Sequence, residues 1–164
     1  MESLTVDAAS PMKGVKPTTK RKEGAGGPSL GETSELLSKP AEFYKWDKTN
    51  AEFDPIANVT ASIVQQTSGN FDYWLLGTDK DGQLFAHKIS AEMNQRWSNK
   101  MLSLTWNHME DDGEQNSWLF RFGEPADYDV FLYTFTRSMW EGLHHISWDK
   151  AKVRSFLQLN SAGH

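Results

Sequence analysis

The sequence predicts a mainly β fold of the α+β class, in which a bent antiparallel sheet of about seven strands is closed by one amphipathic helix. Three observations support this prediction. All 7 Trp, 4 Tyr and 9 Phe of the 164-residue chain lie from Phe43 onward. Between Phe43 and Phe122, short apolar segments alternate with turn residues, as in a series of antiparallel strands. After Gly123, apolar residues recur at spacings of three and four, which is typical of a helix.

Residues 1–40 differ in composition from the rest of the chain. They contain no aromatic residue, but they hold four of the 6 prolines and five of the 12 glycines. Such a segment buries too little apolar surface to offset the entropy lost on ordering. We therefore predict a disordered tail or linker over 1–40, with at most a transient helical turn at 34–37. A folded domain is predicted over 41–158 and a flexible C-terminus over 159–164.

The predicted strands are bounded by clear turn signals. The turns are 47–50, 68–70, 79–82 and 110–113, each rich in Asp, Asn, Gly or Ser. The predicted strands cover residues 43–46, 56–66, 71–78, 83–89, 101–108 and 117–122. In the last two of these, alternate positions place apolar side chains on one face, which predicts a buried side of the sheet. These positions are Leu102, Leu104, Trp106, Trp118, Phe120 and Phe122.

A long helix is predicted after the last strand. Pro125 suits its first turn, because the missing N–H has no helical partner there. An apolar stripe follows at helical spacing and must pack on the sheet. Its members are Tyr128, Phe131, Leu132, Phe135, Met139 and Leu143, and the helix is expected to end near Gly142. A second short helix is predicted after Asp149, with Val153, Phe156 and Leu157 on one side.

One amphipathic helix at the end of several short antiparallel strands favours a pleckstrin-homology-like architecture, a partly open barrel whose end the helix closes. An α+β sandwich, with the helix lying across one face of the sheet, is the alternative from the pattern alone.

The residue types argue against catalysis and metal binding. The chain has no cysteine, and its five histidines show no metal-binding spacing. The acidic turn 110–114 lacks the alternating oxygen ligands of a calcium loop. No nucleophile–base pair stands out. We predict a non-enzymatic protein with no metal and no cofactor. The net charge of -5 argues against a nucleic-acid partner.

The predicted fold raises the question of lipid binding. Phosphoinositide head groups require Lys and Arg in the loop between the first two long strands, and the stretch assigned to that loop, 65–70, has none. Membrane binding by that loop is therefore not expected. The cluster Lys20-Arg21-Lys22 leaves one alternative open, a lipid-associating module that uses the basic tail.

Several sequence pieces resemble one known family. They are Tyr73-Trp74-Leu75, Glu92-Met93-Asn94, residues 102–107, Ser117-Trp-Leu-Phe-Arg-Phe122, Met139-Trp140-Glu141 and Trp148. Their order and spacing are similar to the pleckstrin-homology-like domain of the vacuolar import and degradation protein 27 family, over roughly residues 42–157. Where family members often have Met-Asn-Pro, this chain has Met93-Asn94-Gln95, which removes a fixed φ from that loop.

The resemblance implies a eukaryotic, cytoplasmic protein. Family members usually carry a C-terminal β-propeller of WD40-like character, which this sequence lacks, so a fragment, a short paralogue and an isolated domain all remain open. We expect a protein-interaction module whose partner is a protein or peptide. The predicted contact residues are Met93, Asn94, Trp97, Trp106 and Trp148. For Trp97 and Trp148, which follow no periodicity, a core or capping role is the alternative.

Overall fold

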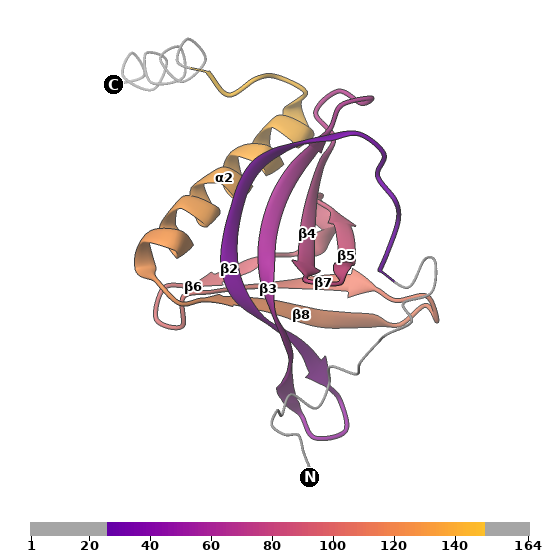
Figure 1. The fold of residues 1–164 in the computed structure, drawn as a ribbon, viewed down its shortest axis with the longest axis vertical. Helices are drawn as coiled ribbons and strands as arrows, with labels where there is room; N and C mark the ends of the chain where they lie inside the picture. The colour runs from indigo at the N-terminus through magenta and orange to yellow at the C-terminus, as the bar shows by residue number, and fades with distance from the viewer. Residues whose placement is uncertain (1–25, 150–164) are drawn as a thin grey trace, which may run out of the picture.

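The computed structural model describes residues 26–149 and shows a single antiparallel sheet with one long helix (Figure 1). The elements are β2 (Thr33–Asp47), β3 (Glu52–Gln66), β4 (Tyr73–Asp79), β5 (Gly82–Lys88), the 3-10 helix η1 (Ala91–Met93), β6 (Arg96–Ser98), β7 (Ser103–Met109), β8 (Gln115–Phe122) and α2 (Pro125–His144). The strand order is β5-β4-β3-β2-β8-β7-β6. The predicted fold class is confirmed.

The two long strands β2 and β3 join the two halves of the sheet. β2 pairs with β3 along its whole length, but with β8 only from Ala41 to Lys45. Figure 1 shows β2 and β3 curving strongly, while β6, β7 and β8 cross them at a steep angle. This bend makes a partly open barrel, and α2 lies across one end of it.

The core lies between the sheet and α2 and is rich in aromatic rings. The inward positions of β7 and β8 are buried as predicted, with Leu104 and Phe120 fully enclosed. From α2 the buried residues of the apolar stripe are Tyr128, Phe131, Phe135 and Met139. Phe131 meets Phe122 with ring centroids 4.8 Å apart. Buried aromatic side chains such as these account for much of the apolar area that a small barrel can bury.

The first strand begins much earlier than predicted. β2 starts at Thr33, inside the range assigned to a tail, so the predicted boundary at residue 41 and the helical turn at 34–37 are wrong. This half of β2 is mostly polar and is held by pairing with β3, while Leu37 packs against the core. Ser38 and Ser62 share a hydrogen bond of 2.8 Å between their Oγ atoms. Residues 1–25 and 150–164, with the basic cluster and the second predicted helix, lie outside the described residues.

Three smaller predictions also need correction. Leu102 lies in the turn before β7, in a left-handed conformation with φ 54°, and not in the strand. Leu143 is 55% exposed, so the buried stripe of α2 stops short of it. The stretch 65–70 joins β3 to β4, whereas the first two long strands are joined by residues 48–51. In that loop, Lys48 is paired with Glu114.

Candidate functional site

A groove runs between the connection from β5 to β6 and the last turns of α2. It encloses about 440 Å³, and we call it the helix groove. Its apolar lining comes from Phe71, Ile89, Met139 and Leu143. β6 follows this connection and is an edge strand, whose one partner within residues 26–149 is β7. The connection that begins in this groove at Ile89 thus leads to a strand with unpaired backbone groups on its free side.

The short segment before β6 is shaped by two of the predicted contact residues. Met93 is buried in the core, and Asn94 caps η1 in the left-handed conformation, with φ 48°. Asn is among the few residues that adopt this conformation readily. Trp97 then packs from β6 against α2, with ring centroids 5.8 Å from Tyr128 and 5.5 Å from Phe135. These three residues lie together and hold the edge strand beside the helix.

The other two predicted contact residues lie elsewhere. Trp106 is completely buried, and its Nε1 donates a hydrogen bond to His87 Nδ1 at 2.9 Å. Trp148 is half-buried beyond the end of α2, with its ring centroid 5.1 Å from that of Trp140. Burial removes Met93 and Trp106 as surface contacts in this conformation. Asn94 is exposed, and Trp97 and Trp148 are partly exposed.

A buried carboxylate, which the sequence analysis missed, ties the end of α2 to the sheet. Glu141 is 6% exposed and accepts hydrogen bonds from the Tyr73 hydroxyl, from Arg137 Nε at 3.3 Å and from the backbone N–H of Trp148 at 2.6 Å. Burial and this carboxylate raise the pKa of Tyr73. The spacing of four between Arg137 and Glu141 was the available signal. Glu141 fixes the direction in which the chain leaves the helix.

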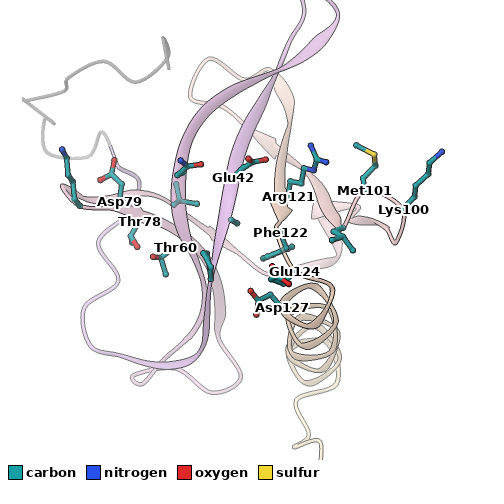
Figure 2. Close-up of a pocket in the computed structure, with 17 residues that line it drawn as sticks. Glu42, Thr60, Thr78, Asp79, Lys100, Met101, Arg121, Phe122, Glu124 and Asp127 are labelled. Carbon is teal, nitrogen blue, oxygen red and sulfur yellow. The ribbon is translucent and has the colours of Figure 1, made fainter. Parts of the chain in front are cut away.

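A larger hollow of about 960 Å³ lies on the outer face of the sheet (Figure 2). We call it the outer hollow. Thr60 and Thr78 face each other across β3 and β4, and Glu42 and Arg121 face each other across β2 and β8. Glu124 and Asp127, at the start of α2, close one side (Figure 2). Among the described residues that line it there is no histidine, serine or cysteine.

No set of three or more metal-ligating side chains comes together within residues 26–149. In the same part of the chain, no helix has the length and apolar character needed to cross a membrane.

A bent seven-stranded antiparallel sheet closed by one C-terminal helix defines a pleckstrin-homology-like domain. The model of the VID27 PH-like domain family matches residues 34–142, and the chain belongs to this family. No curated protein sequence matches the chain.

Two solved structures of the Ran-binding domain of the nuclear pore component Nup2 from Ashbya gossypii share the fold. One has a TM-score of 0.57 and 10% identity and covers 65% of this chain and 94% of its own. The other has a TM-score of 0.55 and 10% identity and covers 64% and 95%. At this identity the likeness shows the fold alone. The family match and the two structures indicate no enzyme family.

Proposed function

We propose that this chain is a non-enzymatic protein-interaction module that binds an extended peptide along β6 and in the helix groove. One observation carries the proposal: an apolar groove lined by Met139 and Leu143 takes in the start of the connection, at Ile89, that leads to the unpaired edge of β6. A peptide that adds a strand to β6 gains main-chain hydrogen bonds, and an apolar side chain of the peptide fills the groove.

Two further observations support this class of function. The outer hollow, although larger, is lined by charges of both signs and has no histidine, serine or cysteine among the described residues that line it. The Nup2 domains, which share the fold, are Ran-binding domains. That likeness supports protein binding as a class and leaves the partner of this chain to experiment.

We also propose a cellular compartment and a cellular process for this module. Membership of the VID27 PH-like domain family supports a eukaryotic protein that acts in the cytoplasm, in vacuolar import and degradation. In this proposal the partner is a protein whose extended segment carries an apolar anchor residue.

The test begins with a peptide selected on the full-length chain from a display library of random sequences. Leu143→Glu places a charge in the helix groove and is expected to weaken binding at least about tenfold, because a buried charge without a partner is costly. Val130→Glu is the matched control: Val130 is also exposed on α2, about 140° away around the helix. Equal binding by both variants, or no peptide selected at all, would refute the proposal.

A further inference from the structure

Away from the helix groove, the sheet has an opening between β5 and β7. β5 is an edge strand, and β7 continues past its pairing with β6, which ends at Thr105. Within the described residues, the part of β7 from Trp106 to Met109 therefore has a strand partner only in β8. A hollow of about 730 Å³ separates this part from residues 86–88 of β5. We call this opening the seam.

Two histidines make a direct contact across the seam. His87 of β5 and His108 of β7 stack face to face, with ring centroids 3.5 Å apart and planes 9° from parallel. His87 is 5% exposed, and its Nδ1 accepts the hydrogen bond from Trp106 Nε1. A nitrogen that accepts a hydrogen bond carries no proton, so the His87 ring is neutral in this arrangement. The Trp118 ring packs edge-to-face with both rings, with its centroid 4.5 Å from that of His87 and 5.5 Å from that of His108.

The charges around the stack oppose a second positive charge. Lys45 of β2 lies over the Trp118 ring, 4.4 Å from its centroid, and its Nζ is 3.9 Å from Glu110 Oε2. Burial, then His108, then Lys45 lower the pKa of His87 to about 2. Burial also lowers the pKa of His108, although Glu110 and Asp111 act in the opposite direction. Each proton is thus taken up more readily by a ring that has left the stack.

We propose that the His87–His108 stack is an acid-sensitive latch, which holds the seam closed while both rings are neutral and opens it when they are protonated. Opening frees the edges of β5 and β7, and the partner that fits there is an extended peptide strand that pairs with them. The latch is independent of the helix groove, because His87 and His108 do not line that groove.

The size of the effect follows from the difference in proton affinity. In an open seam, His87 returns to its ordinary pKa of 6.5, whereas in the closed seam it stays unprotonated down to about pH 2. Lowering the pH from about 8 to about 5 therefore shifts the opening equilibrium by about thirtyfold through His87 alone. His108 adds to this shift in the same direction, because its pKa is also lowered.

The test is hydrogen exchange of the full-length chain at about pH 8 and about pH 5, with protection corrected for the intrinsic exchange rate. Amides of residues 84–88 and 106–109 are expected to lose about thirtyfold in protection at acid pH, while residues 57–64 of β3 serve as an internal reference. Equal losses in the seam and in the reference would mean global unfolding and would overturn the proposal.

A variant pair makes the test specific to the stack. His108→Gln removes one ring, and the acid response of the seam is expected to fall several-fold. His144→Gln, at an exposed position near the end of α2, is expected to respond like the unmodified chain. An unchanged response in His108→Gln would overturn the latch. Should that variant not fold, the side-chain titration of His87 by NMR in the unmodified chain decides. A midpoint far below 6.5 that coincides with seam opening supports the latch, and a midpoint near 6.5 with a closed seam contradicts it.

Discussion

The end of the barrel beneath α2 and the seam between β5 and β7 both contain aromatic rings, but the surroundings of the rings differ. Beneath α2, Phe131 and Phe135 are fully buried among other apolar side chains. At the seam, the rings in contact are two histidines, with Lys45 and Glu110 close by. The two buried side-chain atoms of the described residues without a hydrogen-bond partner, Trp118 Nε1 and Glu110 Oε2, also lie at this end.

Because of this difference, the two regions contribute differently to the stability of the fold and to the pH dependence of that stability. Apolar packing under the helix does not depend on protonation, so it stabilises the fold equally at any pH at which the protein is folded. Polar groups that are only partly satisfied stabilise less, and their contribution changes with pH. We therefore expect the helix-covered end to supply most of the stability and the seam to open first.

The largest effect is expected beneath α2. Phe131→Ala removes a fully buried ring that packs on Phe122 and Phe120, and it should lower the free energy of unfolding by about 3–5 kcal/mol. Chemical denaturation measures the loss. Tyr133→Ala is the control on the same helix, because Tyr133 is more than half exposed, and a change within about 0.5 kcal/mol is expected. Similar losses in the two variants would contradict the assignment of this end as the main source of stability.

The next effect is expected at the seam. The unfolded chain protonates His87 below about pH 6.5, but the folded chain resists down to about pH 2, so stability falls as the pH falls through this window. At about pH 5 the loss from His87 is about 2 kcal/mol relative to neutral pH. Denaturant unfolding at several pH values measures it. In His87→Gln the loss between these pH values should shrink; an identical pH profile would refute the role of His87.

A smaller effect is expected where α2 is tied to β4. Glu141→Gln removes the charge that accepts hydrogen bonds from Tyr73, Arg137 and the Trp148 backbone, and it should cost about 1 kcal/mol. Quenching of tryptophan fluorescence by acrylamide should rise, because Trp148 is held less firmly. Glu52→Gln, exposed at the start of β3, is the control and should change neither quantity measurably. If Glu141→Gln behaves like this control in both measurements, Glu141 does not anchor the end of α2.

The smallest effect is expected at the tip of the β2–β3 hairpin, far from both regions. Ala51 is exposed and adopts a left-handed conformation with φ 54°, which costs a residue with a Cβ roughly 1 kcal/mol. Ala51→Gly should raise the free energy of unfolding by about 0.5 kcal/mol. Thermal unfolding would show the gain, and a lower melting temperature than that of the unmodified chain would contradict it.

Strands with one apolar face could be predicted from the sequence, because alternation such as Trp118, Phe120 and Phe122 reflects burial directly. The first half of β2 could not, because its polar residues are held by pairing with β3, which leaves no periodic signal. β6 has three residues and owes its place to the packing of Trp97 on α2. Such contacts depend on the assembled fold.

The site was harder to predict than the fold, because residue type does not separate a buried tryptophan from an exposed one. Trp106 was predicted both on the buried face of its strand and as a contact residue, and it lies in the core. No sequence motif connects His87 with His108. The two rings meet only because the bent sheet brings β5 beside β7. Leu143 was assigned to the buried stripe, but its side chain is more than half exposed and lines the helix groove.

Binding of a partner at the helix groove, and not in the larger outer hollow, can be tested directly. Its most direct test is an NMR titration of the full-length chain with a selected peptide, followed through the backbone amides. We expect the largest shifts in residues 89–98 and 139–146, whereas Glu42, Thr60 and Arg121 in the outer hollow should stay nearly unchanged. Large shifts at these three residues, with the helix groove unaffected, would contradict this expectation.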